Sequence, residues 1–249
     1  MKKFLPIILL VIGIVIFIGV YLFIVRAKKN VGTPIDEDTV AELPFEKRPF
    51  VSLTPTKDGH YLLLSIQKVD IEGASSLDYE LIYQVPDGPT QGVPGTVDIK
   101  GKSSFETDLL LGSESSGKFR YDAGVEQGNL TLRFRNDEGK LIARFSTEFR
   151  LLSDISDLVS PDSGFKVSLD KKSSNFFVLM DTWGVLAGIP DNQNLKAGPF
   201  GLFSSGKIDE SAKVEIQGAE NIYVWTGNEW IKVEEGQTII DGIYIGTSG

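Results

Sequence analysis

Alternation of apolar and polar residues is the feature that most constrains this chain, and it runs through most of residues 45–153. A period of two places successive side chains on opposite faces of a β-strand. The pattern is clearest in two segments joined by the turn sequence Asn-Asp-Glu-Gly at 136–139. One face of this predicted hairpin is apolar and the other is polar or charged, which predicts an antiparallel sheet covered on one side. The apolar face carries Leu130, Leu132, Phe134, Leu141, Ala143, Phe145, Thr147, Phe149 and Leu151.

The whole segment predicts about eight short strands separated by frequent turns. This pattern is typical of a β-sandwich of the immunoglobulin or fibronectin-III type, which we expect over residues 45–155. The likeness is one of strand pattern, since the chain has no cysteine and therefore lacks a Cys…Trp…Cys signature. The expected strands before the hairpin are 60–71, 77–85, 96–99, 105–111 and 118–121.

A second, smaller β domain is expected over residues 156–249. The sequence DISDLVSPDSG at 154–164 interrupts the alternation and marks the boundary. A segment rich in glycine, proline and asparagine, 183–203, predicts a long loop. The candidate strands of this domain are 165–169, 176–180, 214–216, 222–225, 230–233 and 239–245.

A run of 22 uncharged, mostly apolar residues, 4–25, stands at the start of the sequence. As a helix it would be about 33 Å long, enough for a hydrocarbon core of about 30 Å. A cleaved signal has a shorter apolar region of about 7–15 residues and ends at a small-residue site, whereas this run ends in basic residues. We therefore expect residues 1–30 to form an uncleaved single-pass transmembrane helix, a signal-anchor that holds the protein in the cell membrane.

The orientation of this predicted anchor depends on its flanks. Two lysines precede the apolar run and three basic residues follow it, so the positive-inside rule is close to a tie. A three-residue tail offers nothing to translocate, which favours a cytoplasmic N-terminus and an extracytoplasmic ectodomain; the opposite orientation stays open. Residues 31–44 carry four acidic residues, two prolines and no base, which predicts a linker between the anchor and the first domain.

Charge and composition argue against several kinds of partner and ligand. All 34 acidic residues and 20 of the 25 basic ones lie beyond residue 30, so this part carries a net charge of −14. Such an acidic surface repels phosphate backbones, and we expect no nucleic-acid partner. The lack of cysteine excludes disulfides and thiolate ligands. His60 is the only histidine and follows an Asp-Gly turn, so we predict no metal site and no cofactor.

Two short sequences resemble part of a phosphate-binding loop: GSESSGK at 112–118 and GLFSSGK at 201–207. A functional loop needs a Ser or Thr after the lysine and a helix beyond it. Phe119 and Ile208 occupy that position, and strand-like segments follow, so both sequences predict turns between strands. No set of residues specifies a reaction, and we predict no catalytic residue.

One aromatic cluster is a candidate binding site. Tyr223 and Trp225 share one face of a predicted strand, and a Thr-Gly-Asn-Glu turn leads from it to Trp230. Such rings can fill the core of a small domain, or they can form a surface platform for a sugar or a protein partner. Because the predicted hairpin has two large apolar faces, we expect one tryptophan to be structural and the other exposed.

These features together predict a membrane-anchored, extracytoplasmic protein of the cell envelope with a binding or scaffolding role. Its partner would be a protein or a glycan of the envelope. Two alternatives stay open. One is a subunit of a surface filament or secretion assembly, and the other is an envelope enzyme acting on wall polymer, which would need a pair of carboxylates in a cleft.

Overall fold

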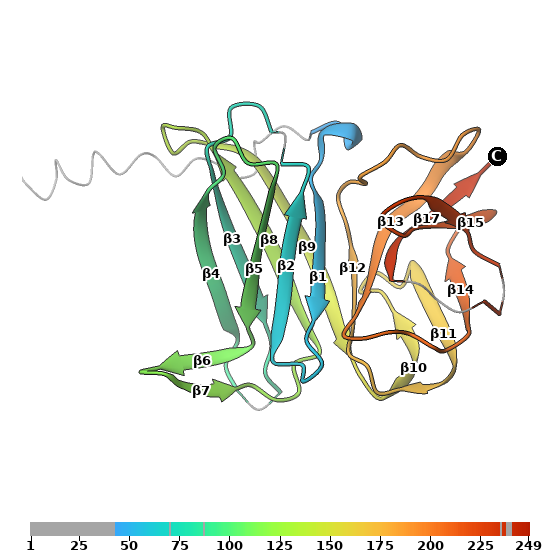
Figure 1. The fold of residues 1–249 in the computed structure, drawn as a ribbon, viewed down its shortest axis with the longest axis horizontal. Helices are drawn as coiled ribbons and strands as arrows, with labels where there is room; N and C mark the ends of the chain where they lie inside the picture. Colours follow the sequence, from blue (N-terminus) through green and yellow to red (C-terminus); the bar gives the residue numbers. More distant parts are fainter. Residues whose placement is uncertain (1–42, 70, 87, 235, 238–240) are drawn as a thin grey trace, which may run out of the picture. The chain divides into compact units, whose positions relative to one another are not determined.

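Antiparallel strands make up nearly all of the part of the chain that the structure describes, and the prediction of an all-β fold is confirmed (Figure 1). The computed structural model describes residues 43–69, 71–86, 88–234, 236–237 and 241–249. The only helix among them is a single 3₁₀ turn, η3 (Phe45–Lys47).

No helix in these residues is long and apolar enough to cross a membrane. The predicted anchor, 4–25, lies outside the described residues, as does the predicted linker up to residue 42.

Two sheets face each other in the N-terminal half. One has three strands in the order β1-β2-β5, and the other contributes β9-β8-β3-β4. Their apolar faces form the sandwich core, in which Leu64, Leu81, Leu132 and Phe149 are almost fully buried. The strand bounds are β1 (Phe50–Pro55), β2 (Tyr61–Gln67), β3 (Ser76–Tyr83), β4 (Gln91–Asp98), β5 (Ser104–Leu110), β8 (Gln127–Arg135) and β9 (Leu141–Leu152).

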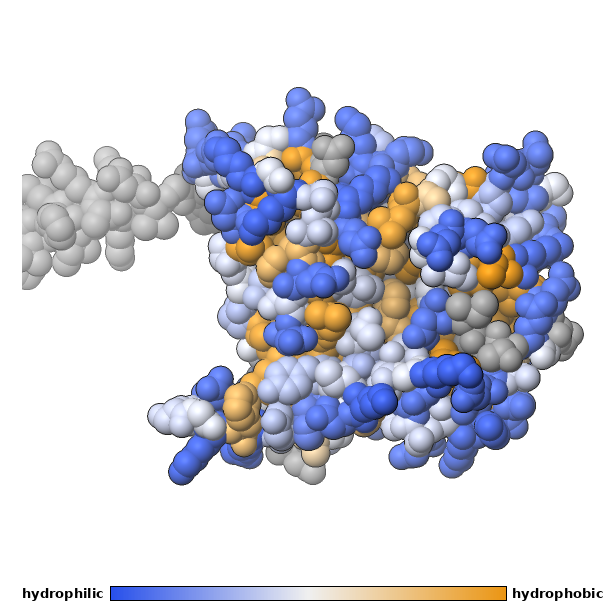
Figure 2. Space-filling view, viewed as in Figure 1, coloured by the Kyte–Doolittle hydropathy of each residue, from blue (hydrophilic) through white to orange (hydrophobic). Residues whose placement is uncertain are grey.

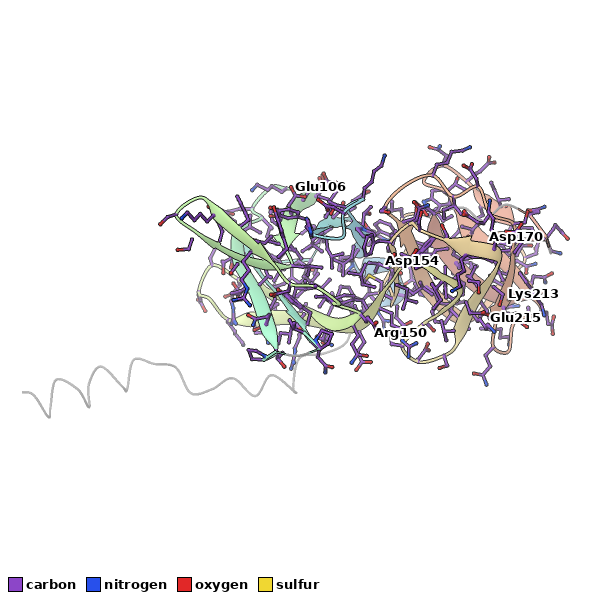
Figure 3. All side chains as sticks on the ribbon, turned by 90° about the horizontal axis from the view of Figure 1, so that it is seen from below. Glu106, Arg150, Asp154, Asp170, Lys213 and Glu215 are labelled. Carbon is purple, nitrogen blue, oxygen red and sulfur yellow. The ribbon has the colours of Figure 1, made fainter. Side chains whose placement is uncertain are left out.

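The alternation in the sequence accounts for this packing. On β9 every second residue is buried, and Phe145 lies opposite Leu132 of β8 in the predicted hairpin. The other face of the sheet carries ion pairs between β8 and β3. Arg135 Nε donates to Asp78 Oδ2 at 2.6 Å, and Arg133 pairs with Glu80. Figure 3 shows Glu106 and Arg150 on the two opposite outer surfaces of the sandwich.

The second sheet of the sandwich continues through the C-terminal half. It has nine strands in the order β16-β15-β17-β13-β12-β9-β8-β3-β4, and its apolar residues in this half serve two cores. On β12, Val178 and Met180 face the sandwich core, whereas Phe177 and Leu179 face a second one, the C-terminal core, which a small sheet of order β10-β11-β14 covers. The bounds are β10 (Ile155–Val159), β11 (Phe165–Ser173), β12 (Phe177–Asp181), β13 (Asn194–Ser204), β14 (Ala212–Ile216), β15 (Asn221–Trp225), β16 (Trp230–Lys232) and β17 (Gly242–Ser248).

Residues Val40–Gly249 form one compact unit. The predicted domain boundary, between 155 and 156, falls at the start of β10 and leaves the nine-stranded sheet shared by both sides. Whether residues 45–155 and 156–249 fold separately stays a prediction, and the shared sheet is the feature that a test must address.

The prediction of a long loop over 183–203 is wrong in its second half, which forms β13 between β12 and β17. The glycines and prolines that suggested a loop have other roles. A bulge at Gly198–Pro199 shifts the register with β17. A Cβ on Gly201 would lie 2.5 Å from the ring of Phe203, so glycine here makes room for a core side chain.

Candidate functional site

The structure places the aromatic residues predicted from the sequence, Tyr223, Trp225 and Trp230, on the edge hairpin β15–β16, here called the tryptophan hairpin. Trp225 lies opposite Trp230 in the register, and their ring centroids are 5.6 Å apart at an angle of 57°. All three side chains are half-buried. The cluster therefore exists, but it is covered in part.

Both tryptophans pack against the sandwich core. Trp230 Nε1 donates to the carbonyl oxygen of Gly188 at 2.7 Å, so the loop after β12 covers the ring. Trp225 Nε1 is buried and has no acceptor among the described residues. Val224, between the two aromatic residues of β15, faces the C-terminal core instead. The geometry gives both tryptophans a packing role, and their predicted role in binding stays a prediction.

Among the residues that the structure describes, the most exposed phenylalanine and tyrosine rings lie on another hairpin, formed by β6 (Gly112–Ser115) and β7 (Lys118–Tyr121). Phe119 is 49% exposed and Tyr121 is 40% exposed. The hairpin stands clear of the sandwich, and the space-filling view shows hydrophobic and hydrophilic surface side by side on it (Figures 1 and 2). Neighbouring exposed rings of this kind make the hairpin a candidate contact surface.

The sequence dictates this hairpin locally. Ser116 and Gly117 both have positive φ, 53° and 75°, which is the backbone of a two-residue type I′ turn. Phe119 and Tyr121 are two residues apart on β7 and so share a face. The first sequence that resembled a phosphate-binding loop is thus a β-hairpin, as its context predicted.

His60 completes a row of three rings, His60, Tyr121 and Phe119, here called the aromatic row. The imidazole stacks on Tyr121 with centroids 3.7 Å apart and planes 3° from parallel. Phe119 lies 6.2 Å from Tyr121 at an angle of 9°. Because the turn between β1 and β2 supplies His60 and β7 supplies the other two rings, only the folded chain brings them together.

An aspartate holds the imidazole in place. Asp58 Oδ1 accepts hydrogen bonds from Thr56 Oγ1 at 2.6 Å and from the backbone N–H of His60 at 3.1 Å. Its other oxygen lies 3.1 Å from His60 Nδ1. The Thr56 hydroxyl, then the backbone N–H, and finally the His60 charge lower the pKa of Asp58. Asp58 therefore stays ionised at neutral pH and orients the ring that stacks on Tyr121.

Two pockets share Tyr121–Gly124 as a wall; His60 lines one of them, and Phe119 lines neither. The pocket on one side has a volume of about 680 Å³ and includes Gln91, Ser113 and Arg120. The pocket on the other side has a volume of about 420 Å³ and includes Asp58, Glu126 and Phe176.

A hydrogen bond from the sandwich core holds the segment Tyr121–Gly124 that separates the two pockets. The hydroxyl of Tyr83, a buried residue of β3, donates to Asp122 Oδ2 at 2.9 Å. Burial and this hydrogen bond both raise the pKa of Tyr83, so it stays a neutral donor. The segment that carries Tyr121 is thereby tied to the sandwich core.

A separate pocket contains a pair of carboxylates, Asp162 and Asp181. Burial, then Asp162 and Glu148, raise the pKa of Asp181 to about 6. Asp162 Oδ1 accepts hydrogen bonds from Ser160 Oγ at 2.5 Å and from the Gly164 N–H at 2.9 Å, which close the turn after β10. Asp181 Oδ1 has no partner among the described residues. Both aspartates line one pocket, and Asp162 has a structural role in the turn after β10.

Comparisons with models of known protein families, with curated proteins and with solved structures found no match. The described residues contain no group of three or more histidine, aspartate or glutamate side chains placed to hold a metal ion. Sequence reasoning named the tryptophan hairpin and missed the aromatic row. The alternation Lys-Phe-Arg-Tyr after a Ser-Gly turn is the one sequence signal for the row. Nothing in the sequence indicates that His60 lies beside Tyr121.

Proposed function

We propose that this chain is a membrane-anchored, extracytoplasmic binding or scaffolding protein of the cell envelope, and that the aromatic row is its binding surface. The observation that carries the proposal is the exposure of Phe119 and Tyr121 on a hairpin that stands clear of the fold. Exposed rings contribute little to folding stability, so a partner is the better account of their placement.

The strand order supports a sandwich of the immunoglobulin or fibronectin-III type. The three-stranded sheet β1-β2-β5 faces the four strands β9-β8-β3-β4, and the connections cross between the sheets. This arrangement matches an immunoglobulin-like sandwich in which one strand is added beside the GFC sheet. Loops of such sandwiches cluster at their two ends and often carry function, and the aromatic row is built from the β1–β2 turn and the β5–β8 connection at one end.

The path of the chain also suits display of this surface. The described chain begins beside η3, and β1 runs from there to the turn that carries His60 at the opposite end of the sandwich (Figure 1). The described chain therefore begins at the end of the sandwich away from the aromatic row. In this proposal the anchor holds the protein in the membrane and the row stays free for a partner.

The test is a sedimentation assay with the full chain in detergent and the insoluble envelope fraction of the cells that make it. We expect the wild-type chain to pellet with the envelope and the double variant Phe119→Ala/Tyr121→Ala to stay in solution. Ile82→Ala is the matched control because Ile82 is also an exposed apolar side chain, 39% exposed, on β3. Equal pelleting of the double variant and the wild type would refute the proposal.

A second candidate, an enzyme acting on wall polymer, is favoured by one observation, the raised pKa of Asp181 beside Asp162. A carboxyl group that keeps its proton near pH 6 can serve as a general acid, with a second carboxylate nearby. The test is release of soluble fragments from dye-labelled wall polymer by the full chain at about pH 5–6. Activity that Asp181→Asn abolishes would support this candidate, and absence of release would remove it.

A further inference from the structure

We infer that the aromatic row binds an uncharged glycan chain that crosses Tyr121 and places a sugar ring in each of the two flanking pockets. This inference rests on the proposed function and names the chemical class of its partner. It depends on three properties of the site: the shape of the ring surface, the polar groups beside it, and the small extent of its apolar area.

The three rings of the aromatic row are nearly parallel to one another. Phe119 and Tyr121 are 9° from parallel on one face of β7, and His60 extends the stack from the β1–β2 turn. A sugar ring has an apolar face of C–H groups, which packs on an aromatic ring, and a rim of hydroxyl groups, which needs polar partners. His60 covers one face of Tyr121, so the ring most open to a sugar is Phe119, which is 49% exposed, and the polar groups beside the row can bind the hydroxyl rim.

The polar groups of the pockets supply both donors and acceptors. Arg120, Ser113 and Gln91 offer donors on one side of Tyr121. Asp58 and Glu126 offer carboxylate acceptors on the other side. A hydroxyl group both donates and accepts, so a polyhydroxylated chain satisfies both sets. The carboxylates, and the acidic protein as a whole, would repel a polyanionic glycan, which leaves an uncharged one.

The apolar area is too small for the core of a stable protein interface. Only four large apolar side chains are strongly exposed in the described part of the chain. Two of them, Ile82 on β3 and Leu186 in the loop after β12, belong to elements other than the row. A typical protein interface buries about 1,200–2,000 Å² around an apolar centre, whereas two rings suffice to stack sugars. The row therefore favours a glycan over a protein.

Two treatments of the envelope fraction test the inference while the identity of the glycan is still open. Sodium periodate cleaves the C–C bond between neighbouring hydroxyl-bearing carbons of sugars, and proteinase K removes protein. We expect pelleting of the full chain to survive proteinase K treatment of the envelope and to fall at least tenfold after periodate. Pelleting that proteinase K abolishes and periodate leaves intact would identify a protein partner and overturn the inference.

The variants separate this failure from failure of the proposed function. If Phe119→Ala/Tyr121→Ala lowers pelleting, and proteinase K abolishes pelleting of the wild type while periodate does not, the row binds a protein, and only the inference fails. If the double variant pellets like the wild type, the proposed function fails as well. We expect Arg120→Ala and Glu126→Ala, one in each pocket, to weaken pelleting to periodate-sensitive material several-fold while the melting temperature stays unchanged. Unchanged pelleting of both would contradict a glycan that spans the two pockets.

Discussion

The tryptophan hairpin and the hairpin β6–β7 have the same local design and different surroundings. Each consists of two short strands and a tight turn, and each places aromatic rings on one face. The two tryptophans of the first pack on the sandwich core, and Trp230 is bonded to the loop that contains Gly188. The rings of the second project into solvent beside two pockets. Alternation shows which side chains share a face, and elements distant in sequence decide whether that face is covered.

The largest expected effect is at the covered hairpin. Trp230→Ala removes a half-buried ring from the sandwich core and leaves the Gly188 carbonyl without its donor. Truncation of a fully buried tryptophan costs about 3–5 kcal/mol, so we expect a loss of about 2–4 kcal/mol here. Urea unfolding of the full chain, followed by circular dichroism, measures this change in the free energy of unfolding.

The matched variant Trp230→Phe keeps most of the packing and loses the hydrogen bond, and we expect it to cost about 1–2 kcal/mol. A cost below about 0.5 kcal/mol for Trp230→Ala would mean that the ring is not part of the core. The claim that the tryptophan hairpin supports the fold would then be wrong.

Two aspartates sharpen the comparison through pH. Burial at the end of β12, then the charges of Asp162 and Glu148, raise the pKa of Asp181 to about 6, whereas hydrogen bonds beside the aromatic row lower the pKa of Asp58. Between about pH 4 and pH 6 the folded state holds a proton on Asp181 that the unfolded state has released, so this group makes stability fall as pH rises. For Asp58 the sign is opposite: its stabilisation is present above about pH 4 and is lost as the pH falls further.

We therefore expect Asp181→Asn to stabilise the protein above about pH 6. A shift of about two pKa units corresponds to about 3 kcal/mol, which screening at this half-buried site reduces to about 1–2 kcal/mol. Melting temperatures of the wild type and the variant between about pH 4 and pH 8 measure the effect, and their difference should vanish towards pH 4. A variant less stable than the wild type at neutral pH would show that the ionised carboxylate has a favourable partner. Asp58→Asn is the counterpart, and it should lower stability at neutral pH.

The smallest effects on stability are expected at the aromatic row. Phe119 is half exposed, and Phe119→Ala should change the free energy of unfolding by less than about 0.5 kcal/mol. Tyr121→Ala loses the stack on His60 and should cost about 1 kcal/mol or less. Thermal unfolding by circular dichroism measures both. A loss above about 2 kcal/mol at either position would show that the row supports the fold and would remove the main reason to assign it a partner.

The sequence predicted the parts of the structure that depend on local period. The shared face of Leu132 and Phe145 and the position of β15 follow from alternation and turn residues, whereas the pairing of these two residues also depends on a register shift beside Phe134. The sequence pattern failed at β13, because the bulge and the room made for Phe203 depend on which strands lie beside it. It also failed to find the site, since the contact of His60 with Tyr121 joins residues from two distant turns.

The central claim is that the exposed row binds a partner and the covered tryptophans hold the fold. The most direct test measures envelope pelleting and melting temperature together for two double variants of the full chain, Phe119→Ala/Tyr121→Ala and Trp225→Phe/Trp230→Phe. The account predicts that the first loses at least tenfold in pelleting while its melting temperature falls by only a few degrees. It predicts that the second melts several degrees lower while its folded molecules pellet like the wild type. Loss of pelleting in the tryptophan variant, with normal pelleting of the other, would contradict the account and return the binding site to the tryptophan hairpin.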